Sequence, residues 1–157
     1  MGLTYADITL ANSSDCILAR QGRLPDSDVK KVTVKALVDS GAYMLVINEN
    51  IKRQLDLPVC DKRGAVLADG TTAGCDIVGP VDVFFKTRAT SCRAIVLPGG
   101  NVEVLLGAIP LEDMDVLIDL KNNELILPPE RPYIAQTIVK REPLIIHIRA
   151  ATGRSLY

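Results

Sequence analysis

Short apolar runs separated by turn-forming residues dominate the chain, which is the pattern of a mostly β protein. The run TYADITL at residues 4–10 is the first predicted strand. In the run VKKVTVKALV at residues 29–38, every second residue from position 32 to position 38 is apolar. This period of two predicts a strand with one buried face. Its last residues are all apolar, so we expect the strand to enter the core just before Asp39.

The remaining pattern predicts two hairpins, further short strands and little helix. Residues 64–85 form two β-rich arms around ADGTTAG, whose glycine and aspartate favour a tight turn. A second hairpin is expected to turn through residues 121–123. A brief helix is predicted after its cap Asn48, and a single helical turn is predicted to begin at Pro110. We therefore predict an all-β fold with one or two short helices. Shorter strands at residues 44–47 and 102–106, with a strand and turn at residues 89–100, complete the predicted set.

Length and composition indicate one globular domain. The chain has 157 residues, of which 48% are apolar and 24% are charged, as in ordinary folded domains. After residue 128 the apolar pattern loosens. We therefore predict a domain at residues 1–128 and a tail at residues 129–157, to which the run PLIIHI could add an edge strand.

Charge and hydropathy argue against several classes of partner. The 18 basic and 19 acidic residues give a net charge of −1, and the basic residues are scattered, so we expect no nucleic-acid partner. No apolar run has the length of a membrane span, and the N-terminus lacks a basic region followed by an apolar one, which predicts no membrane partner and a cytoplasmic location. The four cysteines lie far apart and His147 is the single histidine. We therefore expect reduced thiols, no metal site and no other cofactor.

Asp39 is the most informative residue, because it is a carboxylate at the end of an apolar strand. Ser40 and Gly41 follow it directly. One explanation is a turn, in which the aspartate bonds back to the backbone and the glycine takes a positive φ. The other explanation is functional, a carboxylate held at the end of the strand for chemistry or binding. The tripeptide alone does not decide between them, since such triplets arise readily by chance.

The surroundings of this carboxylate resemble a known family. The segments ALVDSGA at residues 36–42, ADGTTAG at residues 68–74, VLLGAIPLEDMD at residues 104–115 and IDLKNNELIL at residues 118–127 are similar, in this order, to those of the retropepsin-like aspartic proteases. The resemblance covers residues 3–128. It implies the closed acid-protease barrel of that family, a two-fold homodimer, and aspartic endopeptidase activity on a peptide or protein substrate.

The resemblance also assigns roles to the DSGA segment. In this chemistry two carboxylates about 3 Å apart share one proton, so that one acts as base and the other as acid. The sequence contains a single D-[ST]-G triplet, so each chain of a homodimer would supply one Asp39. The pair would activate the attacking water, and Ser40 would bridge to the partner loop. Gly41 would let the backbone approach the substrate closely, and Ala42 would keep the wall of the site small.

The turn at residues 68–74 is similar to the flap that closes over the substrate in this family. A closed flap excludes water and strengthens the electrostatics of the site. An ordinary surface hairpin is the alternative. Residues 105–107 are expected to pack beneath the active loop rather than to take part in chemistry. The substrate-binding residues that the resemblance implies are Ala42, Ala68, Asp69, Gly70, Thr71 and Thr72.

Two positions depart from the retroviral members of the family. Tyr43 and Ala108 stand where an acid and an arginine often pair to support the dimer, so dimer strength does not carry over. Because a fold does not fix a function, a catalytically silent module for dimerisation or peptide binding is the alternative function. A nucleic-acid-binding β-barrel is disfavoured, because only 4% of the residues are aromatic and none is a tryptophan that could stack on bases.

Overall fold

The computed structural model describes residues 2–99 and 102–140, and it is mostly β with few short helices, as the hydrophobic pattern predicts. Within these two ranges no helix is long and apolar enough to cross a membrane. The elements in chain order are β1 (Tyr5–Asn12), α1 (Ser13–Arg20), the 3-10 helix η1 (Asp26–Asp28), β2 (Lys31–Val38), β3 (Leu45–Ile47), α2 (Glu49–Gln54), β4 (Val59–Val66), β5 (Thr72–Phe85), β6 (Arg88–Val96), β7 (Leu105–Leu106), α3 (Ala108–Asp113), β8 (Leu117–Asp119) and β9 (Glu124–Ile126).

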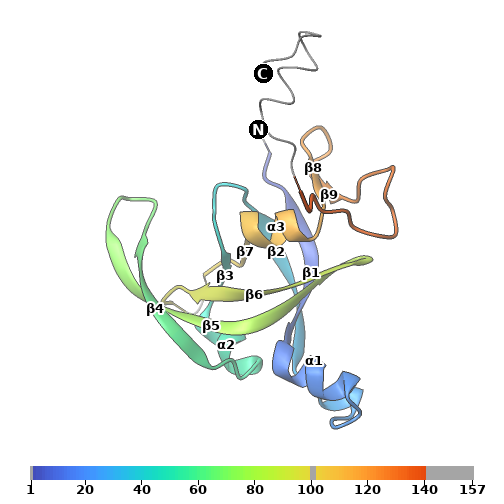
Figure 1. Ribbon diagram of the computed structural model, residues 1–157. Coiled ribbons are helices and arrows are strands. Elements are labelled where there is room, and N and C mark those ends of the chain that lie inside the picture. Colours follow the sequence, from blue (N-terminus) through green and yellow to red (C-terminus); the bar gives the residue numbers. More distant parts are fainter. Residues whose placement is uncertain (1, 100–101, 141–157) are drawn as a thin grey trace, which may run out of the picture.

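Seven strands form one sheet in the order β1-β2-β7-β3-β6-β5-β4, and β1 also pairs with β5 (Figure 1). β8 and β9 form a separate two-stranded sheet. Most neighbouring strands are antiparallel, but β2 runs parallel to β7 and β3 runs parallel to β6. The short β7 therefore lies between β2 and β3, although it follows both in the sequence by a long stretch of chain. This position places β7 directly beneath the loop that carries Asp39.

The buried residues form one cluster, built largely from the alternating apolar positions of the strands. Ile8 and Leu10 of β1 are 1% and 0% exposed, and Val83 of β5 is fully buried. Leu10 and Val83 are direct cross-strand neighbours. Each fully buried aliphatic side chain of this kind contributes about 1.5 to 3 kcal/mol. The first predicted strand is thus confirmed, and its buried residues mark the face that packs into the core.

Two of the three α-helices were expected, but one begins earlier than predicted. α2 follows Asn48, whose Oδ1 accepts a hydrogen bond from the Ile51 N–H at 2.9 Å, so the predicted cap is confirmed. The prediction that the later helical turn begins at Pro110 is wrong, because α3 begins at Ala108 with Gly107 as its cap. Carbonyls of the Asp39 loop accept hydrogen bonds from the first two N–H groups of α3, which a local pattern does not reveal.

The hydrophobic pattern did not predict α1, which raises the number of α-helices in the described residues to three instead of one or two. Asn12 caps this helix: its Oδ1 accepts a hydrogen bond from the Asp15 N–H at 3.1 Å. Its Nδ2 donates to the Leu55 carbonyl at 2.9 Å, which ties α1 to the end of α2. An asparagine followed three residues later by an acid, directly after a strand, is the signal that could have indicated the helix.

Both predicted hairpins are confirmed. β4 pairs with β5 up to the Val66–Thr72 neighbours, and β8 pairs with β9 through Ile118 and Leu125. The β4–β5 hairpin extends away from the body of the molecule (Figure 1). Its turn points to the same side as the loop between β2 and β3, whereas α1 lies at the opposite end. This arrangement sets the predicted flap next to the predicted active loop.

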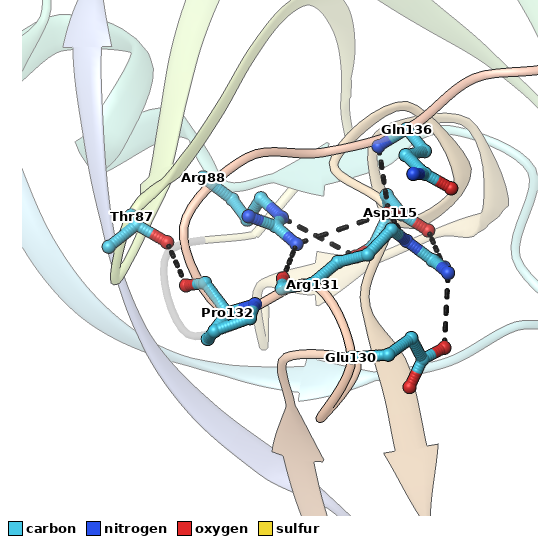
Figure 2. A network of polar contacts seen from close by, with 7 residues as sticks. All are labelled: Thr87, Arg88, Asp115, Glu130, Arg131, Pro132 and Gln136. Carbon is cyan, nitrogen blue, oxygen red and sulfur yellow. Dashed lines mark hydrogen bonds and ion pairs between the residues drawn. The ribbon is translucent and has the colours of Figure 1, made fainter.

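A polar clamp, formed by Arg88, Asp115 and Arg131, holds the chain that follows β9 (Figure 2). Arg131 donates to both carboxylate oxygens of Asp115 at 2.8 and 2.9 Å, and the Gln136 N–H donates to the same carboxylate at 2.9 Å. The Arg88 side chain, which is 1% exposed, donates to the Arg131 carbonyl. The clamp therefore joins β6, the end of α3 and the segment after β9.

Past residue 128 the described chain contains no helix or strand up to residue 140. Its anchoring comes from the clamp and from the Thr87 hydroxyl, which donates to the Pro132 carbonyl at 3.1 Å. The run PLIIHI lies outside the described residues. The boundary between a domain at residues 1–128 and a tail at residues 129–157 stays a prediction.

Candidate active site

Backbone hydrogen bonds fix the loop of residues 39–44, which connects β2 to β3. The Asp39 N–H donates to the carbonyl of Leu106 in β7 at 3.0 Å. The Ala42 N–H donates to the Asp39 carbonyl at 3.1 Å and closes a tight turn. Because β7 pairs with both β2 and β3, it holds the two ends of the loop in place.

The chain that enters α3 passes so close beneath this loop that residue 107 has to be a glycine. The Ala108 N–H at the start of α3 donates to the Ala42 carbonyl at 2.8 Å. A Cβ atom on Gly107 would lie 2.3 Å from the Met44 carbonyl oxygen and 2.8 Å from that of Ala42. The φ of Gly107 is −88°, which suits any residue, so the need for glycine comes from the close approach. These contacts confirm that residues 105–107 pack beneath the loop.

The Asp39 carboxylate has one protein donor within the part of the chain that the structure describes. This donor is the Gly41 N–H, which lies 2.9 Å from Oδ1 of the half-buried Asp39 side chain. A Cβ atom on Gly41 would lie 3.1 Å from the same oxygen, so glycine lets the backbone come this close. The back-bonding that the first explanation predicts is therefore present, but it uses only one carboxylate oxygen. The positive φ that it predicts for the glycine is wrong, since Gly41 does not have one. The other oxygen is left for a ligand or a second chain.

The Asp39 loop and the β4 arm of the hairpin enclose a cleft of about 700 Å³. Four of the predicted site residues line it, namely Asp39, Gly41, Ala42 and Ala68. An apolar cleft with one carboxylate in its wall suits an extended apolar peptide placed beside a reactive acid. The other lining residues, most of them apolar, are Tyr43, Met44, Val46, Arg63, Gly64, Ala65, Val66, Leu67, Ile95, Leu97 and Leu105.

The tip of the β4–β5 hairpin is organised by its own hydrogen bonds. Oδ1 of Asp69 accepts from the Thr71 N–H at 2.9 Å and from the Thr71 hydroxyl at 2.6 Å. The hydroxyl bond is the main cause that lowers the pKa of the Asp69 carboxyl below its ordinary value. Gly70 has a φ of +85°, which this tight turn requires. These residues and Thr72 do not line the cleft, so their contact with a substrate stays a prediction.

Ser40 also lies outside the main cleft. It is exposed, and it borders a smaller hollow of about 290 Å³. A hydroxyl that bridges to the loop of another chain has to be exposed in the single chain. The predicted bridging role is compatible with this position and stays a prediction. The other residues of the hollow come from α3, β8 and the residue before β8, namely Ala108, Leu111, Glu112, Val116, Leu117 and Ile118.

Sequence reasoning missed most of the residues that line the cleft. The β4 arm contributes all of residues 63–68, and Ile95 and Leu97 come from the end of β6 and the residue after it. Strand alternation could have grouped the second set but not the first. That both sets face Asp39 depends on how the hairpin and β6 pack against the loop, which the alternation does not contain.

Two of the four cysteines are chemically quiet. All four are free, and burial is the main cause that raises the pKa of Cys92 to about 12 and that of Cys16 to about 11. Both are therefore neutral thiols at physiological pH, whereas the thiolate is the nucleophilic form. His147 lies outside the described residues. Among residues 2–99 and 102–140 no group of three or more histidine, cysteine or acidic side chains could hold a metal ion.

The family model of the gag-polyprotein putative aspartyl protease matches residues 26–113 of this chain. These residues include the strand before Asp39, the loop that carries it, both arms of the hairpin and the whole of α3. The match therefore spans more than half of the chain and contains every residue that lines the cleft.

Two curated proteins and one solved structure are also similar to the chain. DNA damage-inducible protein 1 of Neurospora crassa is 31% identical over 121 residues, and that of Candida glabrata is 36% identical over 95 residues. These matches cover 74% and 59% of this chain but 27% and 22% of the two relatives, so the chain spans about a quarter of their length. The retroviral protease-like domain of Ddi1 from Leishmania major matches with a TM-score of 0.51 at 20% identity, over 82% of this chain and 90% of that one. At this identity the likeness shows the fold alone.

Proposed function

Because this chain belongs to the gag-polyprotein putative aspartyl protease family, in agreement with its predicted retropepsin-like character, we propose that it is a homodimeric aspartic endopeptidase. The observation that carries the proposal is the position of Asp39, at the end of β2 and in the wall of an apolar cleft beside a β-hairpin. The proposed substrate is an extended segment of a peptide or protein. Since most of the cleft wall is apolar, we expect aliphatic side chains next to the bond that is cut.

The proposed mechanism uses two Asp39 carboxylates, one from each subunit. Together they hold a water molecule and share one proton, because two like charges so close cannot both ionise. The ionised carboxylate takes a proton from the water as it attacks the peptide carbonyl, and the protonated one gives its proton to the carbonyl oxygen. A second transfer protonates the leaving amine. The Gly41 N–H orients each carboxylate through its hydrogen bond to Oδ1.

The proposed dimer has support in the exposed apolar side chains around the active loop. Tyr43 is 70% exposed, and Ile109, whose N–H donates to the Tyr43 carbonyl at 3.0 Å, is 37% exposed. A second chain packed on this side of the molecule would bury both side chains. Tyr43 stands where retroviral enzymes often have an acid, so its contact in a dimer would be apolar rather than ionic.

Two further features support the finer points of the proposal. β1 pairs with both β2 and β5, which is the strand pairing that a closed acid-protease barrel needs. The β4 arm of the hairpin lines the cleft while the tip does not. If the tip closes over a peptide bound in the cleft, it would exclude water. The residues that it would bring to the substrate are Asp69, Gly70, Thr71 and Thr72.

Cleavage of a mixed peptide library by the wild type and by Asp39→Asn tests the peptidase. We expect cuts by the wild type between mildly acid and neutral pH, read by mass spectrometry, and none by the variant, because an amide cannot take the proton of the water. Asp39→Asn added in excess to a fixed amount of wild type should lower the activity as mixed dimers form. Activity per chain that is unchanged by dilution and by the added variant would contradict the dimer.

The second candidate function is a retropepsin-like module that binds peptides without cutting them. The observation that favours it is the replacement of the acid and arginine that support retroviral dimers by Tyr43 and Ala108. Absence of cuts by the wild type, from protein shown to be folded and dimeric, would support this module. Retention of the biological role by Asp39→Asn would support it as well.

A further inference from the structure

The cleft beside Asp39 contains one basic side chain, that of Arg63 in β4. Of the described residues that line this cleft, only these two carry a charge, and most of the others are apolar. When a peptide fills the cleft it displaces water. A charge on the peptide that meets Arg63 would then interact with it more strongly than in bulk solvent.

Arg63 lies in the wall of the cleft and remains exposed in the single chain. It lies directly opposite Cys75 of β5, so the two side chains share one face of the hairpin. Its Nη1 lies 3.5 Å from the Sδ atom of Met44, in the loop that follows Asp39. The guanidinium therefore reaches from the hairpin to the active loop, where an extended peptide would pass.

Arg63 has no carboxylate partner within the part of the chain that the structure describes. The acids nearest to it along the hairpin are engaged by other cations, Asp61 by Arg93 at 3.8 Å and Asp76 by Lys52 at 3.5 Å. The thioether that Arg63 does contact is a weak acceptor. A ligand carboxylate could replace that contact at little cost in free energy.

We propose that Arg63 is a specificity-determining residue that selects an acidic side chain, aspartate or glutamate, in the bound peptide. The inference rests on the proposed function and names its substrate class, an aliphatic peptide segment that carries one carboxylate. A guanidinium holds a carboxylate through two parallel hydrogen bonds, a geometry that glutamine does not reproduce. In a homodimer each half of the cleft would contain one Arg63, so an acidic side chain could be recognised on either side of the cut.

A positional glutamate scan tests the role of Arg63. Peptides of leucine, valine and alanine carry one glutamate at each position in turn, and each peptide has a twin with glutamine at that position. The wild type should cleave the best glutamate peptide with a kcat/KM about tenfold higher than that of its twin. Arg63→Gln should lose the preference, so that its kcat/KM values for the glutamate peptide and the glutamine twin become similar. Arg63→Lys should keep part of the glutamate preference, because lysine keeps the positive charge but lacks the two parallel N–H donors of the guanidinium.

Lys62→Gln is the matched control. It removes the same charge from the same strand, but Lys62 lies on the outer face, where its side chain is 82% exposed and its Nζ lies 3.6 Å from Asp76. This variant should retain the wild-type preference. Added salt should reduce the preference in the wild type and leave the glutamine twins unaffected, since the attraction is electrostatic.

Binding of the same peptides, measured by fluorescence anisotropy, separates this inference from the peptidase. A glutamate preference in binding that is lost in Arg63→Gln, without cleavage of any peptide, would support the role of Arg63 and contradict the peptidase. Cleavage with equal rates for every glutamate and glutamine pair would overturn the role of Arg63 and leave the peptidase standing. A preference that Arg63→Gln retains, in binding or in cleavage, would also overturn it.

Discussion

Asp39 and Asp115 are two aspartates that follow short elements of the same fold, and the structure surrounds them in opposite ways. Asp115 accepts two hydrogen bonds from Arg131 and one from the Gln136 N–H (Figure 2). The Arg131 bonds are the main cause that holds the pKa of this carboxyl at about 2. Asp39 has one donor among the described residues, the Gly41 N–H.

The difference separates a structural acid from a candidate reactive one. A carboxylate whose oxygens are all occupied by donors stays ionised and joins segments of the chain, as Asp115 does. Asp39 lies in the wall of a cleft with an oxygen to spare. A carboxylate oxygen that has no donor from its own chain can accept a hydrogen bond from a substrate, a water molecule or a second subunit.

Exchange of each aspartate for asparagine should have opposite consequences, and the loss of cleavage is the largest effect that we expect. Asp39→Asn should lower kcat/KM at least about 1000-fold, because the proton acceptor is removed. The amide oxygen can still accept the Gly41 N–H, so the free energy of unfolding should change by less than about 0.5 kcal/mol. Asp115→Asn should lower the thermal midpoint and keep the cleavage. Peptide kinetics and thermal unfolding of both variants measure this, and equal effects on stability would contradict the distinction.

Gly107, which lies beneath the Asp39 loop, should be the position around this loop at which a substitution most strongly reduces stability. Gly107→Ala places a methyl group 2.3 Å from the Met44 carbonyl oxygen, and the two backbones have to separate. We expect a loss of about 3 kcal/mol in the free energy of unfolding, measured in urea, together with loss of cleavage. Gly74→Ala is the matched control, since nothing lies within 4 Å of its added atom. A Gly107→Ala protein of unchanged stability would contradict this prediction, because it would show that the two backbones can separate without cost.

Substitution of Arg88, the buried arginine of the polar clamp, should have the next largest effect on stability. Arg88→Met keeps an unbranched apolar stem but removes the donor to the Arg131 carbonyl, which is left without that partner. We expect a loss of about 2 kcal/mol in the free energy of unfolding, with cleavage per folded dimer unchanged. Arg93→Met serves as the control, because its ion pair with Asp61 is largely exposed. A loss of cleavage that exceeds the loss of folded protein would connect the clamp to the active site.

The tip of the hairpin should tolerate change better than the loop. Gly70→Ala meets no neighbouring atom, but it forces an alanine into a φ of +85°. The cost is about 1 kcal/mol, and we expect it to appear as faster hydrogen exchange at the tip rather than as global unfolding. Slower cleavage with unchanged global stability would support a flap. Unchanged exchange at the tip would contradict the strained turn.

The smallest expected effect is the pH dependence of the clamp, since both partners keep some contact with water. The folded pKa of Asp115 is about 2, below its ordinary value of 3.8. Its stabilising contribution is therefore complete above about pH 4 and is lost as the pH falls toward 2. A double-mutant cycle of Asp115→Asn and Arg131→Gln should show coupling at pH 6 that fades across this window. Coupling that is unchanged at pH 2 would mean that the carboxylate is not its source.

The local pattern predicted the strands, both hairpins and α2, because each is specified by a few neighbouring residues. The period of two in residues 29–38 marks the strand, and Asn48 supplies the N-cap of α2. The start of α3 depends on contacts with distant carbonyls, those of the Asp39 loop, so the local pattern placed it wrongly. α1 has a local capping signal in Asn12 and Asp15, which the hydrophobic pattern does not include.

The sequence by itself determined that this is a mostly β chain of the retropepsin-like family, with a single DSG segment at the end of a buried strand. Alternation, turn residues and a motif are short-range features, and the order of residues contains them. Only the tertiary structure decided which side chains face Asp39, that Arg63 lies among them, and that Asp115 is already paired. These facts depend on how β4, β6 and the segment after β9 pack against elements that are far away in sequence. Such contacts are set by the whole fold and not by the neighbouring residues of each element.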